Sequence, residues 1–192
     1  GNCIFYNCRK LEQIIFETKL FEVENSAFMN CRSLRKIVFT AEAGEQTSVD
    51  KVLAQIPTTV AVYFTGREQT AGLLYPEYSE MYEEIGPAHI FGLNIEGEGF
   101  RARKEISQGR INYAGYDSVF EKAKNEESAE ILSEMSLLRL RYPYQLGEKA
   151  KEQYETYVKQ QSELMITKFV KQKETEWLEF LFGSSLFSER EL

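Results

Sequence analysis

Hydrophobic and polar positions near the start of the chain recur with a fixed spacing. The segment Phe-Tyr-Asn-Cys-Arg-Lys-Leu-Glu-Gln-Ile-Ile-Phe begins at Phe5, and Phe-Met-Asn-Cys-Arg-Ser-Leu-Arg-Lys-Ile-Val-Phe begins 23 residues later, at Phe28. Seven of the twelve positions are identical. A sequence that repeats in register at this period predicts structural units that stack on one another and share a core.

Each copy is predicted to form one coil that contains a short strand. The inward positions are Leu11, Ile14 and Phe16 in the first copy and Leu34, Ile37 and Phe39 in the second. Because side chains alternate along a strand, the outward positions are Gln13, Ile15 and Glu17, then Lys36, Val38 and Thr40. Ile15 and Val38 form a small apolar stripe on this face. Two interpretations are open: the face binds a partner, or the C-terminal part of the same chain covers it.

The stretch Ala27-Phe-Met-Asn-Cys-Arg-Ser-Leu-Arg-Lys-Ile37 fits the pattern A-F-x-x-C-x-x-L-x-x-I. This pattern resembles the BspA-like leucine-rich repeats of bacterial surface antigens, and the period lies within the range of roughly 20–29 residues for leucine-rich repeats. The resemblance implies a binding platform, often in a surface-exposed protein. We expect residues 1–45 to be the last repeats of a longer array, with further repeats upstream of Gly1.

The three cysteines, Cys3, Cys8 and Cys31, all lie in the repeat segment. An odd number without paired spacing does not predict a disulfide framework. Cys8 and Cys31 occupy equivalent positions in neighbouring coils, where a disulfide is sterically conceivable. Because their side chains should point in parallel, buried free thiols that pack as small hydrophobic groups are favoured.

Residues 46–115 are predicted to form a mixed α/β segment. The pattern predicts a helix over 49–56 after Ser48, a strand over 58–64, a short helix over 75–85, and two strands over 88–96 and 100–106 that form a hairpin around Gly97-Glu-Gly99. Gly86-Pro87 should end the short helix.

Few residues of this middle segment suggest chemistry. Gly97-x-Gly99 lacks the third glycine and the lysine of phosphate-binding loops. A basic cluster follows it, formed by Arg101, Arg103, Lys104 and Arg110. Arg101 and Arg103 should share one strand face, where they either bind a carboxylate or phosphate or pair with nearby acids.

The remaining titratable candidates favour structural roles. His89 is the single histidine and is expected in the core or an interface. The pairs Glu83-Glu84 and Glu126-Glu127 are expected on solvated faces.

From residue 116 to residue 192 the apolar spacing becomes helical and predicts stacked antiparallel helices. The predicted apolar faces are Tyr116, Phe120 and Ala123; Ile131, Met135, Leu138 and Tyr142; Ala150, Tyr154, Tyr157 and Val158; Met165, Ile166, Phe169 and Val170; and Trp177, Leu178 and Leu181. The last two helices loosely resemble an ankyrin-like helical hairpin. Ser188-Glu-Arg-Glu191 has the form of a capping box, which predicts a further helix start just before Leu192.

Composition and charge narrow the range of possible functions. The net charge is −7. Residues 1–40 carry +2 and the rest −9, so the acidic bulk argues against nucleic acid as a main partner. The chain has no apolar run long enough to span a membrane, and one histidine without a CxxC pair predicts neither a zinc site nor another cofactor. The first residues do not have the pattern of a signal peptide. The cellular location is left open between the cytoplasm and the bacterial cell surface.

The sequence thus predicts an α+β protein with two leucine-rich-repeat coils, a mixed segment and a helical array. The expected function is non-catalytic protein–protein interaction through Gln13, Ile15, Glu17, Lys36, Val38 and Thr40. The alternative is surface adhesion or carbohydrate binding, which the family resemblance suggests. A third possibility is an enzyme with a site around His89, Arg101 and Arg103, although no nucleophile–base spacing supports it.

Overall fold

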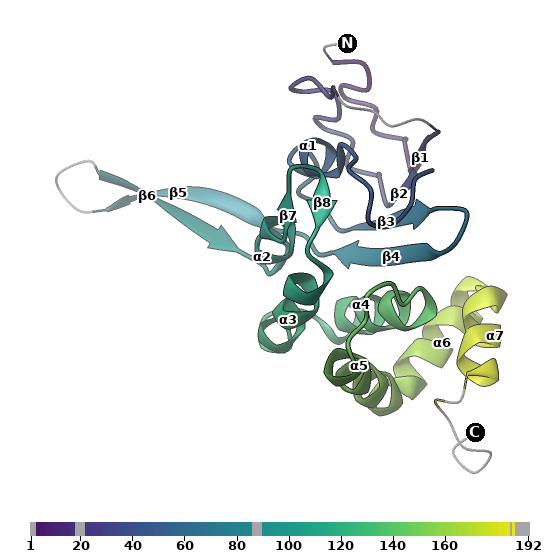
Figure 1. Cartoon of the computed structure of the whole chain (residues 1–192). Helices are drawn as coiled ribbons and strands as arrows, with labels where there is room; N and C mark the ends of the chain where they lie inside the picture. The colour runs from purple at the N-terminus through teal and green to yellow at the C-terminus, as the bar shows by residue number, and fades with distance from the viewer. Residues whose placement is uncertain (1–2, 18–21, 86–89, 185, 187–192) are drawn as a thin grey trace.

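The computed structural model describes residues 3–17, 22–85, 90–184 and 186. The fold mixes helices and strands and is of the α+β class (Figure 1). Figure 1 shows the strands of the main sheet near the N-terminus, the helices gathered towards the C-terminus, and one hairpin that projects away from both. The predictions for Gly86-Pro87, His89 and Ser188–Glu191 fall outside the described residues.

The main sheet has the strand order β1-β2-β3-β4. Strand β1 (Gln13–Phe16) pairs in parallel with β2 (Lys36–Phe39), and β2 pairs in parallel with β3 (Val60–Thr65). The register places Ile14 beside Ile37, as the 23-residue period predicts. The two copies of the repeat therefore lie side by side in one sheet.

Inward aromatic rings form a ladder across these strands. Phe16 stacks on Phe39 with ring centroids 5.0 Å apart, and Phe39 stacks on Phe64 at 5.4 Å. Strand β3 therefore continues the stacking of the repeats, although the spacing from Ile37 to its neighbour Val62 is 25 residues instead of 23. Helix α1 (Val49–Leu53) precedes β3 and buries Val52 and Leu53, where the sequence predicts a helix.

Strand β4 (Thr70–Tyr75) turns back and pairs antiparallel with β3. Its inward residues continue the core, and Ala71 and Leu73 are fully buried. The antiparallel strand ends the parallel stack, and its outer edge faces the helices.

The hairpin differs from the one that the sequence predicts. Strand β5 (Ser79–Ile85) occupies the stretch expected to be helical, and it pairs antiparallel with β6 (Ile90–Glu96). The expected strand over 100–106 is helix α2 (Gly99–Lys104), followed by the short hairpin β7 (Ile106–Ser107) and β8 (Arg110–Ile111). The expectation of a hairpin around Gly97-Glu-Gly99 is therefore wrong. Strand pairing overrode helical preference in β5, whereas Arg, Ala and Lys favour helix in α2.

The C-terminal part is helical, as predicted, with α3 (Tyr113–Ala123), α4 (Ala129–Arg141), α5 (Glu148–Gln160), α6 (Ser162–Gln172) and α7 (Thr175–Gly183). The N-cap side chains of Asn112 and Ser128 accept backbone N–H groups at the starts of α3 and α4. Most residues of the predicted apolar faces are buried or half-buried. Val170 is an exception, because its side chain is 60% exposed.

The sheet and the first helices share one core. Buried residues of the repeats, such as Leu34 and Ile37, belong to the same apolar cluster as Tyr116, Phe120 and Met135 of the helices. A second, smaller cluster joins α4 to α6 and α7 through residues such as Leu137, Met165 and Leu181. The first helices therefore extend the core beyond β4, and α6 and α7 pack around the second cluster.

Candidate partner-binding surface

The outward face of the sheet consists of two rows of neighbouring residues. One row, defined by the strand register, runs through Gln13, Lys36, Ala61 and Leu74. The next row runs through Ile15, Val38, Tyr63 and Gly72. Four of the six residues predicted to bind a partner lie in these rows, and Glu17 and Thr40 follow at the ends of β1 and β2.

Exposure along this face changes from strand to strand. Ile15 is 52% exposed, and Gln13, Glu17, Lys36 and Thr40 are exposed as well. Val38 is only 8% exposed, which corrects the expectation of an exposed apolar pair. Val38 lies between Ile15 and Tyr63 in its row, so its outward side chain is enclosed by its neighbours.

The helices cover the β3–β4 half of the face. Gly72 makes this approach possible, because an added Cβ would lie 2.9 Å from Cδ2 of Tyr142 and 3.2 Å from Cδ2 of Leu138. The rings of Tyr63 and Tyr142 meet edge to face, with centroids 5.7 Å apart. The C-terminal helices therefore cover the end of the outward face at β4, whereas the outward positions of β1 are exposed.

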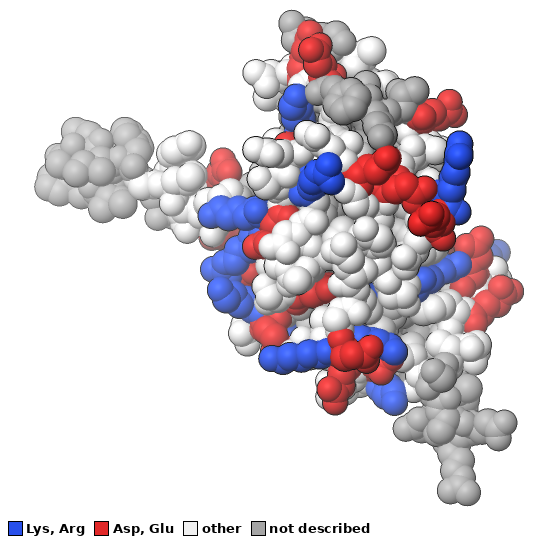
Figure 2. All heavy atoms as spheres, viewed as in Figure 1, with Lys and Arg blue, Asp and Glu red and all other residues white. Residues whose placement is uncertain are grey.

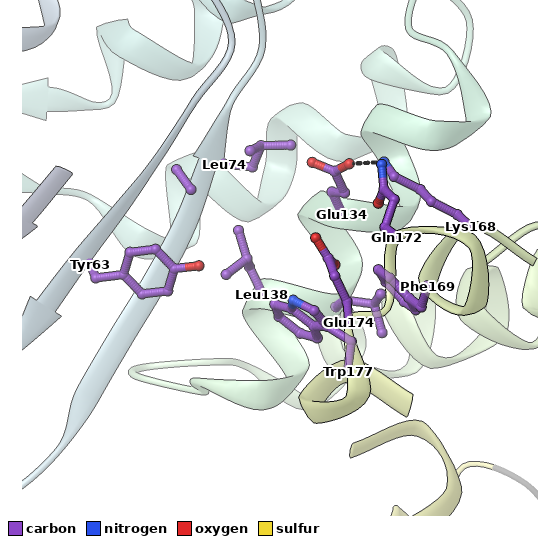
Figure 3. Close-up of a pocket in the computed structure, with 11 residues that line it drawn as sticks. Tyr63, Leu74, Glu134, Leu138, Lys168, Phe169, Gln172, Glu174 and Trp177 are labelled. Carbon is purple, nitrogen blue, oxygen red and sulfur yellow. Dashed lines mark hydrogen bonds and ion pairs between the residues drawn. The ribbon is translucent and has the colours of Figure 1, made fainter. Parts of the chain in front are cut away.

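A groove of about 230 Å³ lies where the covered half meets the helices. It is lined by Ala61, Tyr63 and Leu74 from the sheet and by Glu134, Leu137, Leu138, Lys168, Phe169, Gln172, Glu174 and Trp177 from helices α4, α6 and the start of α7. Figure 3 shows the Tyr63 ring on the sheet side and Trp177 and Glu174 across from it.

The groove combines apolar walls with charged groups. Lys168 forms an ion pair with Glu134 (Figure 3). The carboxylate of Glu174 has no ion pair within the described part of the chain. Burial raises the pKa of Tyr63 well above its ordinary value, and the nearby Tyr142, Glu134 and Glu174 act in the same direction. The Tyr63 hydroxyl is therefore neutral at physiological pH and available as a hydrogen-bond donor or acceptor.

Lys36 connects the open half of the face to the groove. Its ammonium lies 5.2 Å from the centroid of the Tyr63 ring, a cation–π distance. Lys36 is also the register neighbour of Ala61, which lines the groove. The exposed strand positions and the groove are thus adjacent parts of one surface.

Arg103 has a different place from the one predicted. It lies on α2, not on a strand, and its guanidinium donates hydrogen bonds to four backbone carbonyls, those of Pro76 (2.7 Å), Ile56 (2.8 Å), Gly99 (2.9 Å) and Thr58 (3.1 Å). Burial lowers the pKa of Arg103 to about 10. The side chain is engaged within the fold, so it is not placed to bind a carboxylate or a phosphate.

Arg101 pairs with acidic residues of the same chain, which is the second of the two roles expected for the basic cluster. It contacts Glu98, and its Nη1 lies 3.5 Å from Oε1 of Glu126. Glu98 is fully buried, and its backbone N–H donates to Oε1 of Glu127 at 3.0 Å. Burial raises the pKa of Glu98 and of Glu127. Glu127 is half-buried, which corrects the expectation of a solvated face, and no sequence pattern indicates the burial of Glu98.

The cysteines are free thiols. Cys3 is exposed, Cys8 is half-buried and Cys31 is buried. The Cys31 thiol donates to the carbonyl of Phe5 in the neighbouring coil at 3.0 Å, and burial raises its pKa. A buried thiol with a raised pKa is a packing group instead of a nucleophile.

Within the described ranges, no group of three or more His, Cys, Asp or Glu side chains is arranged to hold a metal ion. Among the same residues, no helix combines the length and the apolar character needed to cross a membrane.

Comparison with known families gave a match in the N-terminal part of the chain. Residues 1–49 match the model described as BspA type leucine-rich repeat region (6 copies). The N-terminal segment consists of BspA-type leucine-rich repeats. Neither the curated proteins nor the solved structures gave a match to the chain.

The BspA-type match confirms the resemblance found in the sequence and indicates a repeat module for interaction or adhesion. Repeats of this type are generally non-catalytic. The match ends before β3 and before all helices of the C-terminal part, so the ankyrin-like resemblance of the last two helices stays a prediction.

The sequence patterns do not indicate the groove. They predict Trp177 and Phe169 on apolar helix faces and Tyr63 on a strand, but they do not join the three residues in one site. The available signal was the outward position of Tyr63 in a strand whose inward residues are Val60, Val62 and Phe64. This outward position indicates a site beside the repeats only if β3 is known to stack on them.

Proposed function

We propose that the chain is a non-catalytic leucine-rich-repeat module that binds a segment of a protein partner. The segment would lie across the outward positions of β1 and β2 and extend into the groove beside β3. We also propose that β1, β2 and β3 belong to three successive coils and that the helices cap the last of them.

The observation that carries this proposal is the continuity between the exposed row and the groove. The register joins Gln13 and Lys36 to Ala61, which lines the groove. An exposed Ile15 beside charged neighbours, followed by a pocket with aromatic and aliphatic walls, matches the apolar centre and polar rim of protein interfaces. Tyrosine and tryptophan are also the residues that most often dominate binding energy.

A displayed library of random peptides selected on the full chain tests the proposal. The chain has one tryptophan, Trp177, so its fluorescence reports directly on occupation of the groove. We expect selected peptides to change the Trp177 emission on binding. The double variant Ile15→Ser and Lys36→Glu should weaken the same peptides by about tenfold, which corresponds to about 1.4 kcal/mol.

Val170→Ser is the matched control, because Val170 is an exposed apolar residue outside the groove. It should leave affinity unchanged. Peptides that bind the Ile15/Lys36 variant and the wild type equally would refute the site, even if they bind the chain tightly.

Carbohydrate binding is the alternative to test in parallel, with a glycan array. Sugar sites commonly offer an open aromatic face. Here Phe169 stacks on Trp177 with centroids 6.0 Å apart, and the Arg141 guanidinium lies 4.6 Å from its ring centroid. These contacts occupy much of the ring and favour a peptide over a sugar.

A further inference from the structure

The hairpin of β5 and β6, called the arm below, projects from the body of the molecule (Figure 1). Each of its strands pairs only with the other within the described residues. The outer edges therefore present backbone N–H and C=O groups that no further strand satisfies. An isolated two-stranded sheet is only marginally stable in water, so a third strand would stabilise it.

One face of the arm carries exposed apolar side chains. Tyr82 and Leu93 are directly opposite each other in the register, and they are 71% and 48% exposed. The neighbouring pair on the same face is Glu80, which is exposed, and Ile95, which is half-buried. Tyr82 and Leu93 thus form a small contiguous apolar patch with a carboxylate beside it.

The charge of the two strands has one sign. Within β5 and β6 the sequence contains four glutamates, Glu80, Glu83, Glu84 and Glu96, and no lysine, arginine or aspartate. Figure 2 shows red and white spheres on the described part of the arm, with blue spheres beginning at its base. A partner that covers the apolar pair would therefore gain from positive charge beside it.

The base of the arm is fixed to the body. The guanidinium of Arg103 donates hydrogen bonds to the carbonyl of Pro76, just before β5, and to that of Gly99, just after β6. It also lies 5.0 Å from the ring centroid of Tyr78. The N–H of Tyr78 also donates to the carbonyl of Pro57 at 3.0 Å. A fixed base presents the arm in one orientation, which lowers the entropy lost on binding.

We infer that the arm is a second interaction site, which binds an extended, basic segment of a partner protein by strand addition. The partner segment alternates Lys or Arg with apolar residues. Its backbone extends the two-stranded sheet, its apolar side chains cover Tyr82 and Leu93, and its cations lie near Glu80. This mode of recognition uses backbone pairing for affinity and alternate side chains for specificity. The inference is independent of the groove.

Fluorescence anisotropy with defined peptides tests this inference on the full chain. The probe is a labelled peptide of about ten residues that alternates Lys with Val, long enough to pair with the seven residues of β5. One comparison peptide replaces Lys with Glu, and another carries two central prolines, which remove backbone donors. We expect binding of the Lys peptide alone, with an affinity that falls as salt is raised.

The protein variant is Tyr82→Ser with Leu93→Ser, which should weaken the Lys peptide by about tenfold. Glu80→Lys is a second variant that leaves the apolar pair intact, and it should weaken binding through charge alone. Val170→Ser is the control for loss of an exposed apolar group, and it should have no effect. The Ile15/Lys36 variant should bind the Lys peptide normally, which separates this site from the groove.

Three outcomes would overturn the inference. The Lys peptide could bind the Tyr82/Leu93 variant as tightly as the wild type, or the Glu or proline peptide could bind equally well. Sedimentation could instead show dimers of the chain that dissociate in the Tyr82/Leu93 variant, in which case a second copy covers the arm.

Discussion

Tyr116 satisfies both backbone groups of Leu74. The N–H of Leu74 donates to the Tyr116 oxygen at 3.1 Å, and the Tyr116 hydroxyl donates to the carbonyl of Leu74 at 2.5 Å. Leu74 lies on β4, the last strand of the main sheet, and Tyr116 lies on α3. One buried phenol thus closes part of the sheet edge and joins the repeats to the helices.

We therefore expect Tyr116→Phe to destabilise the chain. The substitution keeps the ring but leaves a buried N–H and a buried C=O without their partner, which costs about 1–3 kcal/mol. Urea denaturation followed by circular dichroism measures the change. Tyr82→Phe removes the hydroxyl of an exposed tyrosine and should change stability little. Equal effects of the two variants would mean that the hydroxyl of Tyr116 contributes nothing to the edge.

A buried ion pair joins α3 to α4. Arg139 Nε and Nη2 donate to the two carboxylate oxygens of Asp117 at 2.7 and 2.9 Å, and the Tyr154 hydroxyl donates to Oδ1 at 2.9 Å. Arg139 is fully buried and Asp117 is 4% exposed. Removing one member leaves an uncompensated buried charge, so we expect Asp117→Leu to cost about 3–5 kcal/mol.

The double variant Asp117→Leu with Arg139→Met separates the pair from its members. Because it removes both charges, we expect it to be more stable than either single variant in urea denaturation. A double variant that loses the sum of the two single effects would show that the members act independently.

The sequence predicted the repeats because their pattern is local. The Phe-x-Asn-Cys-Arg motif and the inward Ile and Phe residues occur once in each copy, so a period and a strand direction suffice to place Ile14 beside Ile37. The apolar spacing of the helices is equally local. The placement of Ile15 on the open face followed from alternation alone.

The other features depend on contacts between distant residues. Glu-rich β5 became a strand because β6 pairs with it, and Arg103 became buried because four carbonyls surround its guanidinium. The groove requires Tyr63 and Trp177 to meet across more than a hundred residues of sequence. Neither periodicity nor motif spacing contains this information, since each depends on how the helices pack against β4.

The stability of the base of the arm should depend on pH through Glu98. Burial raises its pKa above the ordinary value of 4.5, against the opposing effect of Arg101, and Glu126 and Glu127 raise it further. The folded chain therefore binds this proton more tightly than the unfolded chain does. The resulting stabilisation is complete below the unfolded pKa and is lost as the pH rises through the folded pKa.

Glu98→Gln removes this titration while keeping the shape of the side chain. We expect the free energy of unfolding of the variant, relative to the wild type, to increase as the pH is raised from about 4.5 towards 7. Urea denaturation across this range measures it. A difference between variant and wild type that stays constant with pH would show that Glu98 has an ordinary pKa.

Gly72 sets the distance between the sheet and α4, and therefore the width of the groove. A Cβ at this position would lie 2.9 Å from the ring of Tyr142 and 3.2 Å from Leu138, closer than side chains pack. We expect Gly72→Ala to displace α4 and to cost about 1–3 kcal/mol, as overpacking of a core does. Gly147→Ala is the control for the steric effect, because a Cβ there has no atom within 4 Å; since Gly147 is the N-cap of α5, where Ala is less favourable than Gly, it should cost up to about 1 kcal/mol without moving α4. The emission of Trp177, which lines the same groove, should shift in the Gly72 variant and not in the control. A Gly72→Ala variant with wild-type stability and emission would show that α4 can move away from β4 without cost, and that the groove has no fixed width.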